Sequence, residues 1–331
     1  MRFDLSTATS DPVSAPGSAS SPDLAWAVHR VADGDASAGV LSVLRTLTVN
    51  DLPSLERLVR EQPELGLRLW PTPLWTTVLP AVRADLAAVQ QMAGAAPSAR
   101  VAGAERLARF AQSQTPSSLV TGRLPDLMRG EQNARTWRAI LSTLSRDAGG
   151  VDSPLGRVLP EALNAAWPDV RRLACETAAA QPDPAFAAWL RPLLTDADAS
   201  VRAAAASAAG ACGNPAVLDG LRRQMADDSA TVRRAATEAA VRLGDETALA
   251  ELLRQAHDTD VRVRRAAAEA IGRVVQPDRA VAVLSLAWAE TDADCRGAYE
   301  AFFARHLGPA SGDRYETRLD HWASAVQSPG L

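Results

Sequence analysis

An internal repeat of 31 residues restricts this chain more than any other feature of its sequence. A step of 31 residues from Val232 brings other valines into register, and Asp294 occupies the fifth place. Small residues recur with the same step at the positions four and seven residues after each of these valines. The aligned sets are Val170, Val201, Val232 and Val263; Ala174, Ala205, Ala236, Ala267 and Ala298; and Thr177, Ala208, Ala239, Ala270 and Ala301. A period of this length indicates a stack of similar units.

Each unit has the pattern of a helical hairpin. In the first helix of one unit, Val232, Ala235, Ala236 and Ala239 follow the i, i+3, i+4, i+7 spacing of an amphipathic helix. The predicted N-caps are Asp198, Ser229, Asp260 and Thr291, and a second helix is marked by Leu190, Leu221, Leu252 and Val283. Pro, Gly, Asn and Asp separate the two helices of a unit. One hairpin cannot bury both of its faces, so neighbours must stack.

The predicted fold class is therefore all-α, an alpha-alpha superhelix of about five to six hairpins. We place the repeat array at residues 131–312, where Trp137 opens a degenerate early unit whose second helix covers 159–166. Phe302 and Phe303 make the final unit bulky, and a helix over 313–326 is expected to cap the array within a C-terminal segment 313–331.

The N-terminal third lacks a clear period. Residues 1–22 are rich in Ser, Ala, Pro and Asp and have the composition of a disordered tail. Residues 23–130 are expected to form an N-terminal helical region, either a separate fold or a set of degenerate repeats, with helices near 41–47, 55–60, 79–92 and 104–111.

The repeated segment resembles a known family. The string Asp-x-x-Val-Arg-Arg-Ala-Ala-x-Glu-Ala is complete at residues 260–270 and has serine in first place at 229–239. It is similar to the HEAT repeat, particularly to the short HEAT-like units named after phycobilisome lyases, over roughly residues 167–308. The resemblance implies an armadillo-type solenoid with a groove that grips a partner. It does not select one function, because such repeats serve adaptors, chaperone-like factors, metalloenzymes, DNA glycosylases and bilin lyases.

Two rows of arginines are the candidate partner-binding residues. They are Arg171, Arg202, Arg233 and Arg264 in one register, and Arg172, Arg234, Arg265 and Arg296 in the next. Stacked helices would turn each row into a ladder for phosphates or carboxylates. The alternative is internal pairing with the glutamate four residues on, or with Asp198, Asp228, Asp258 or Asp260 in an adjacent turn. The family resemblance favours internal pairing for the arginine that directly follows the valine.

A second candidate surface is the segment 70–75, in which Trp70 and Trp75 flank two prolines. Rigid aromatic side chains anchor many interfaces. Because the chain has 8 Trp but only 5% aromatic residues, its core needs the indoles as well, and our interpretation favours burial.

Catalytic, cofactor and metal sites are not predicted. The sequence has no Gly-rich phosphate loop, no GxSxG motif and no Cys-His spacing typical of catalysis. HEAT-like iron enzymes carry His-Glu pairs, whereas no histidine here precedes a glutamate; the histidines are His29, His257, His306 and His321. Trp167 beside Asp169 is the single hint of a glycosylase site, and Asp169 is more simply a helix cap.

Charge and cysteine usage give weak guidance about partners and compartment. The net charge is -4, all 35 basic residues are arginine, and the 3 cysteines lack disulfide or zinc spacing. The lack of lysine fits a GC-rich coding bias, and we expect a cytoplasmic bacterial protein with no apolar span. The preferred hypothesis is a non-enzymatic scaffold that binds another protein. Nucleic-acid binding is the alternative, and a lyase or chaperone-like factor for a chromophore or client protein is a lower one.

Overall fold

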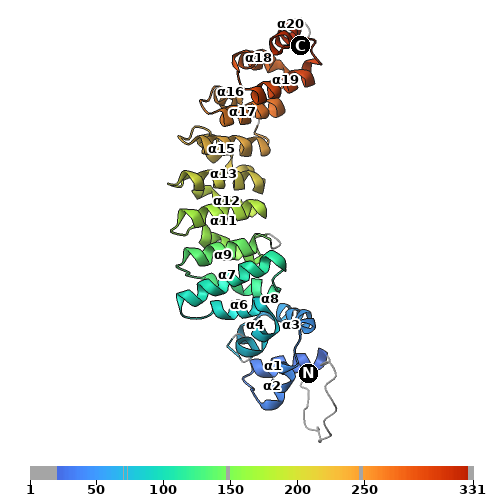
Figure 1. Cartoon of the computed structure of the whole chain (residues 1–331), viewed down its shortest axis with the longest axis vertical. Coiled ribbons are helices and arrows are strands. Elements are labelled where there is room, and N and C mark those ends of the chain that lie inside the picture. The colour runs from blue at the N-terminus through green and yellow to red at the C-terminus, as the bar shows by residue number, and fades with distance from the viewer. Residues whose placement is uncertain (1–20, 70, 73, 147–149, 246–248, 327–331) are drawn as a thin grey trace. The chain divides into compact units, whose positions relative to one another are not determined.

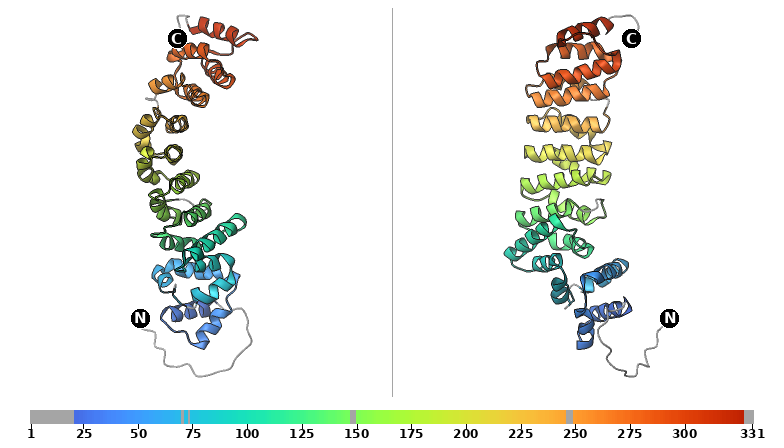
Figure 2. Two further views of the ribbon diagram at one scale, coloured as in Figure 1. Left: turned by 60° about the vertical axis from the view of Figure 1, so that its left-hand side comes forward. Right: turned by 45° about the vertical axis from the view of Figure 1, so that its right-hand side comes forward.

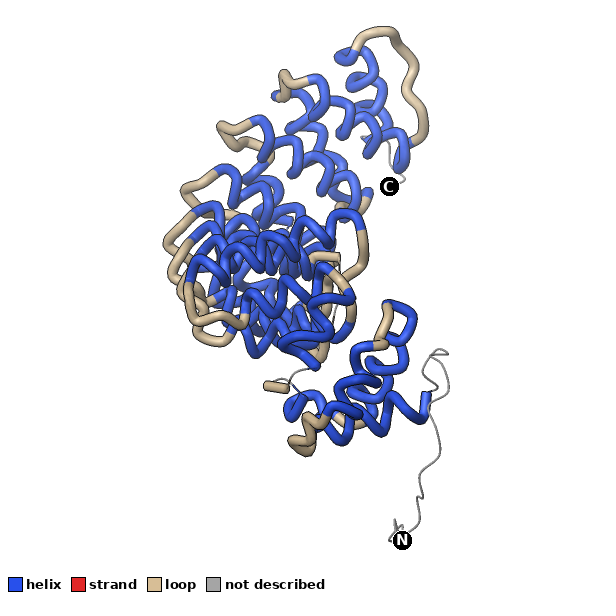
Figure 3. Tube along the Cα trace, turned by 60° about the horizontal axis from the view of Figure 1, so that its bottom comes forward, coloured by secondary structure: helices blue, strands red, loops and turns tan. Residues whose placement is uncertain are grey.

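The structure is a computed structural model that describes residues 21–326 except 70, 73, 147–149 and 246–248. Throughout these residues the regular structure is helical, without strands (Figure 3). The all-α prediction is therefore confirmed. The expected tail at 1–22 lies outside the described residues except for its last two, which open the first helix. In the described part of the chain, every helix is too short or too polar to cross a membrane.

The chain divides into two compact units, Met1–Val120 and Thr121–Leu331. The elements of the first unit, labelled in Figure 1 where there is room, are α1 (Ser21–Ala32), α2 (Ala38–Arg45), α3 (Leu52–Glu61), α4 (Pro63–Leu69), a π-helical turn (Leu74–Val78), α5 (Leu79–Val82), α6 (Ala84–Met92) and α7 (Pro97–Ser113). Leu44, Leu55 and Leu107 are fully buried among them. Helix α8 (Ser118–Met128) spans the division.

The prediction of one helix over 79–92 is wrong in one respect, because the helix is interrupted at Arg83. Arg83 has extended backbone angles (φ −144°, ψ 148°) and separates α5 from α6. Its guanidinium donates to the buried carboxylate of Asp85 at 3.0 and 2.9 Å and to the carbonyl of Thr115 at 3.1 Å. The backbone N–H of Ser117 also donates to Asp85, at 2.8 Å. A buried carboxylate needs such donors, and apolar periodicity does not reveal a network that joins distant segments.

The second unit is a series of helical hairpins. Its helix pairs are α9 (Ala134–Leu144) with α10 (Pro154–Leu163), α11 (Pro168–Ala180) with α12 (Ala187–Leu190), α13 (Ala199–Cys212) with α14 (Leu218–Gln224), α15 (Ala230–Arg242) with α16 (Leu249–Gln255), α17 (Val261–Val274) with α18 (Ala280–Ala289), and α19 (Ala293–Leu307) with α20 (Tyr315–Val326). Figure 2 shows these pairs as successive layers. Helix α10 begins earlier than expected because Ser153 caps it, its Oγ accepting from the N–H of Gly156 at 3.1 Å.

Small residues let the first helices of successive layers pack closely. Ala174, Ala205, Ala236 and Ala267 are fully buried. At Gly210 of α13 even a Cβ atom would lie 2.7 Å from the Cα of Ala239 on α15. The alanine-rich repeat thus sets the spacing between layers, and larger side chains at these positions would force the helices apart.

Gly213 ends α13 in the left-handed conformation (φ 72°). A Cβ there would meet no atom within 4 Å, so Gly213→Ala should destabilise through the backbone alone, by about 1 kcal/mol. Gly297→Ala is the matched control: its Cβ also points into open space, but Gly297 lies inside α19 at negative φ. It should be neutral or stabilising. Equal effects of the two variants in chemical denaturation would contradict this explanation.

The 31-residue register does not continue into α19, which corrects part of the prediction. The buried residue equivalent to Val263 is Cys295, whereas Asp294 is exposed. The helix begins after Asp292, which accepts from the N–H of Asp294 and Cys295 at 3.1 Å, and Thr291 is not the N-cap. Leu286 still follows Gln255 by 31 residues, so one extra residue enters between Leu286 and Glu290. The core positions of α19 are consequently Tyr299, Phe302 and Phe303 rather than Ala298 and Ala301.

Helix α20 covers the apolar end of the second unit. Trp322 stacks on Phe303 with ring centroids 5.3 Å apart, and its Nε1 donates to the carbonyl of Gly308 at 2.9 Å. The hydroxyl of Tyr315 donates to the carbonyl of Ala287 at 2.9 Å. The bulky residues of α19 are therefore matched by bulky residues of the cap.

Candidate functional site

The first arginine row joins each layer to the next. Arg202 donates from Nε and Nη2 to the two oxygens of Asp227 at 2.8 and 2.9 Å, and Arg233 donates in the same way to Asp258 at 2.6 and 2.7 Å. The equivalent pairs are Arg171 with Asp196, at 2.8 and 2.9 Å, and Arg264 with Glu290, at 3.1 and 3.4 Å. These are two-pronged, charge-assisted contacts between residues 25 or 26 positions apart.

The same side chains also hold the turns before their own helices. Nη1 of Arg202 donates to the carbonyls of Asp196 and Ala197 at 2.9 and 3.2 Å, and Arg233 makes the matching contacts with Asp227 and Asp228. The prediction of internal pairing is confirmed for this row. Of the four named aspartates, Asp258 was right and the other three were wrong. Asp196 and Asp227 pair with the arginines, whereas Asp198 caps α13, Asp228 offers its carbonyl, and Asp260 caps α17 and pairs with Arg262.

These contacts set the charge states of the pairs. Burial alone would raise the pKa of Asp196, but hydrogen bonds from Arg171 and from the N–H of Asp198 outweigh it and lower the pKa below 3.8. The pKa values of Asp227 and Asp258 are lowered in the same way. Hydrogen bonds to the carboxylates raise the pKa of the partner arginines. Both members of each pair are charged at neutral pH.

A loss of stability in acid follows from the direction of these shifts. A carboxylate whose pKa is lowered by folding stabilises the native state above its unfolded pKa, and this contribution is lost as the pH falls through the folded value. The free energy of unfolding should therefore fall steeply below about pH 4. Urea titrations at a series of pH values measure it. An acid slope unchanged by the paired replacement Arg233→Met with Asp258→Leu would contradict the assignment.

The second arginine row has a different environment. Arg172 and Arg234 pair with Glu176 and Glu238, four residues on along the same helices, as predicted, and the Arg234 pair measures 2.6 Å. Their side chains are about 40% exposed, so these pairs add little stability. In α13 the corresponding positions hold Ala203 and Ser207.

The other two members of this row were predicted wrongly. Arg265 pairs with Asp292 and Asp294 of the next layer, at 3.4 and 2.5 Å, instead of with Glu269. Arg296 belongs to the first row once the extra residue is counted, since its Nε donates to the carbonyl of Glu290 at 2.8 Å. Its guanidinium also lies 4.6 Å from the ring centre of Tyr315.

The exposed side of α11, α13, α15 and α17, which we call the first-helix face, contains shallow hollows. A trough of about 300 Å³ lies over α13, where Ala203, Ala204 and Ser207 form a low floor between Arg172 on α11 and Arg234 on α15. Two further hollows of about 260 Å³ follow each other along the seam of α15 and α17 and share Glu238, Ala266 and Glu269. We call this pair the α15–α17 furrow.

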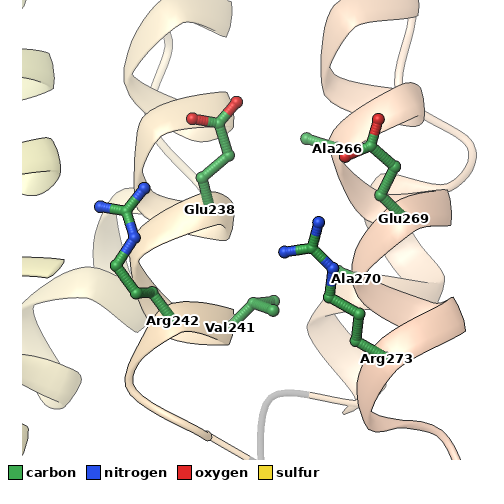
Figure 4. A pocket seen from close by; sticks show the side chains of 7 residues that line it. All are labelled: Glu238, Val241, Arg242, Ala266, Glu269, Ala270 and Arg273. Carbon is green, nitrogen blue, oxygen red and sulfur yellow. The ribbon is translucent and has the colours of Figure 1, made fainter. Parts of the chain in front are cut away.

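One end of the furrow contains arginines that sequence analysis missed. Arg242 and Arg273 lie one repeat apart and line the same hollow as Glu238 and Glu269. In Figure 4 the Arg273 side chain extends toward α15, while the Arg242 side chain extends along the side of α15 away from α17. Within the described residues, neither arginine forms an ion pair or hydrogen bond. The available signal was the 31-residue step from Glu238 and Arg242 to Glu269 and Arg273.

The remaining candidates lie elsewhere. Trp75 is buried in the first unit, and Trp70 lies outside the described residues. Asp169 lies in the first turn of α11, where it pairs with Arg138 at 3.1 Å, and Trp167 is the N-cap residue. Burial raises the pKa of Cys175 to about 12, which keeps this thiol protonated at neutral pH. In the described ranges, His, Cys, Asp and Glu side chains form no group able to hold a metal ion.

The interlayer arginines lie within a stretch that matches a known family. The HEAT-repeat family matches residues 157–242 and 224–302. These residues are HEAT repeats. The second unit thus contains a HEAT-repeat solenoid, a fold consistent with a protein-interaction scaffold. Its interlayer arginines and carboxylates lie within the matched HEAT stretch, as do the trough and the furrow.

Other comparisons find similar structures but no similar curated sequence. The chain is 16% identical to Escherichia coli YibA, covering 81% of this chain and 97% of that one, with a TM-score of 0.49. It is 16% identical to a chain of the CpcE–CpcF complex of phycocyanin lyase from Nostoc sp. PCC7120, covering 73% and 94%, with a TM-score of 0.40. An engineered protein is 14% identical, covering 93% and 100%, with a TM-score of 0.45. No curated protein matches the sequence.

Proposed function

We propose that this HEAT-repeat protein is a non-enzymatic scaffold that binds another protein through its first-helix face. The proposal rests on the difference in environment between the two arginine rows. The first row is engaged in contacts between layers, whereas the neighbouring row and the hollows beside it are exposed.

The shape of the trough supports a partner that brings its own side chains. Ala203 and Ser207 interrupt the row of Arg–Glu pairs, which leaves space beside Arg172 and Arg234. The open shape and mixed polar lining suit a surface contact with a few inserted side chains. They do not suit an enclosed small-molecule site, which would bury most of its ligand.

The charge pattern supports a protein in preference to a nucleic acid. The first-helix face carries Glu176, Glu238 and Glu269 beside its arginines. A phosphodiester backbone would bring negative charge against these carboxylates, while a protein can present groups of both signs.

Affinity purification tests the proposal. The tagged chain is recovered from its native cell extract with and without nuclease, at low and high salt, beside a Ser207→Arg variant. Ser207 is exposed on the trough floor, so the new side chain should fill the trough and remove the partner while the fold persists. Thr195→Arg, at an exposed position after α12, is the control. The proposal fails if nuclease removes everything recovered, or if Ser207→Arg retains the same partner as wild type.

A further inference from the structure

We propose that the α15–α17 furrow binds an extended protein segment in which a basic and an acidic residue stand two positions apart. This inference rests on the proposed function, since it specifies the chemistry of the partner. The acidic side chain would lie between Arg242 and Arg273, and the basic one would face Glu238 and Glu269.

The two ends of the furrow differ in how their charges are compensated. At one end, Arg234 is paired with Glu238, Arg262 with Asp260 at 2.7 Å, and Arg265 with Asp292 and Asp294. At the other end, Arg242 and Arg273 have no carboxylate partner among the described residues. Two guanidinium groups without partners in the lining of one hollow favour a carboxylate there, because guanidinium groups donate charge-assisted hydrogen bonds to carboxylates.

Carboxylates beside this site restrict what can enter. Glu238 and Glu269 line the same hollow, and Figure 4 shows them beyond the two guanidinium groups along the helices. Glu269 also lacks an ion pair among the described residues. A polyanion would meet these carboxylates, so the furrow favours a segment that carries one charge of each sign.

The spacing specifies the sequence pattern of the segment. Residues four apart in a helix are separated by about 6 Å along its axis, which is the step from Glu238 to Arg242 and from Glu269 to Arg273. In an extended strand, residues two apart point to the same side and are separated by about 6.6–6.8 Å. A strand lying along the seam therefore matches one basic and one acidic side chain to the two pairs, in the pattern basic-x-acidic or its reverse.

A structural role for the two arginines does not account for their arrangement. Arginine near a helix C-terminus complements the helix dipole, and Arg242 and Arg273 lie in the last turns of α15 and α17. Interaction with the helix dipole does not require the two arginines to line the same hollow, yet both line it here.

Fluorescence anisotropy with short capped peptides tests the inference on the full chain at low salt. One peptide carries Arg-Ala-Glu between glycines, and a second has the same composition in the order Arg-Glu-Ala, which directs the charges to opposite sides of a strand. The spaced peptide should bind about tenfold more tightly, which corresponds to one well-formed charged contact. Arg242→Ala with Arg273→Ala should remove this preference. Arg191→Ala with Arg223→Ala, which removes one exposed arginine directly after α12 and one on α14, should preserve it.

A charge swap separates recognition from general attraction. Arg242→Glu with Arg273→Glu should gain affinity for a peptide with Arg-Ala-Arg and lose affinity for the one with Arg-Ala-Glu. Equal binding of the spaced and unspaced peptides, or tighter binding of an oligonucleotide that the alanine pair abolishes, would overturn the inference. If affinity purification still recovers a nuclease-resistant partner that Arg242→Ala with Arg273→Ala does not release, the furrow proposal fails and the scaffold proposal stands.

Discussion

Replacing Arg233 with methionine should lower the free energy of unfolding of the second unit by about 2–3 kcal/mol. The side chains of Arg233 and Asp258 are only 14% and 9% exposed. Methionine keeps much of the aliphatic volume but leaves the Asp258 carboxylate without its two-pronged partner. It also removes the donor to the carbonyls of Asp227 and Asp228. Urea denaturation followed by circular dichroism measures the loss.

Arg234→Met is the matched control one residue away. Arg234 has the same chemistry but pairs with Glu238 on its own helix, and both side chains are about 40% exposed. Exposed pairs at this spacing contribute about 0.3–0.5 kcal/mol. Similar losses for Arg233→Met and Arg234→Met would mean that the first row does not hold the layers together.

Trp322→Ala should destabilise the C-terminal end by about 3–5 kcal/mol. Trp322 is 2% exposed, stacks on Phe303 and satisfies the carbonyl of Gly308. Its removal would leave a cavity against Phe303 and weaken the attachment of α20. Because an end layer of a solenoid contacts a neighbour on one side only, α20 should detach before the other helices unfold.

Limited proteolysis and urea denaturation measure this effect together. The variant should be cleaved between α19 and α20 under conditions in which the wild type is intact. Trp288→Ala, which truncates a tryptophan that is 45% exposed on α18, should change neither result by much. A Trp322→Ala variant with wild-type stability would show that α20 does not cap the array.

The hairpin fold could be predicted because each helix repeats the same local signals. Valine at one position of the first helix, alanine at the positions that contact the next layer, and Asp or Ser before the helix all recur at a fixed step. The register of α19 could not be predicted in this way. Alanine is so common in the chain that Ala298 and Ala301 continue the pattern by coincidence, while one extra residue moves Tyr299 and Phe302 into the core.

The candidate site was only partly accessible from the sequence. The two arginine rows were identified, and pairing of Arg172 with Glu176 follows from helix geometry alone. The partner of Arg171 could not be predicted, because Asp196 and Asp198 lie in the same turn. Only the path of the backbone decides which of the two faces the arginine. Arg242 and Arg273 were missed because their importance lies in a seam between two helices, which a single-helix pattern does not show.

Hydrogen–deuterium exchange of the chain with and without its purified partner tests the central claim most directly. If the first-helix face is the binding surface, the partner should slow amide exchange in α11, α13, α15 and α17 and leave α14 and α16 nearly unchanged. Ser207→Arg should abolish that protection without altering exchange in the free protein. Protection confined to the second helices, or to the first unit, would contradict the account.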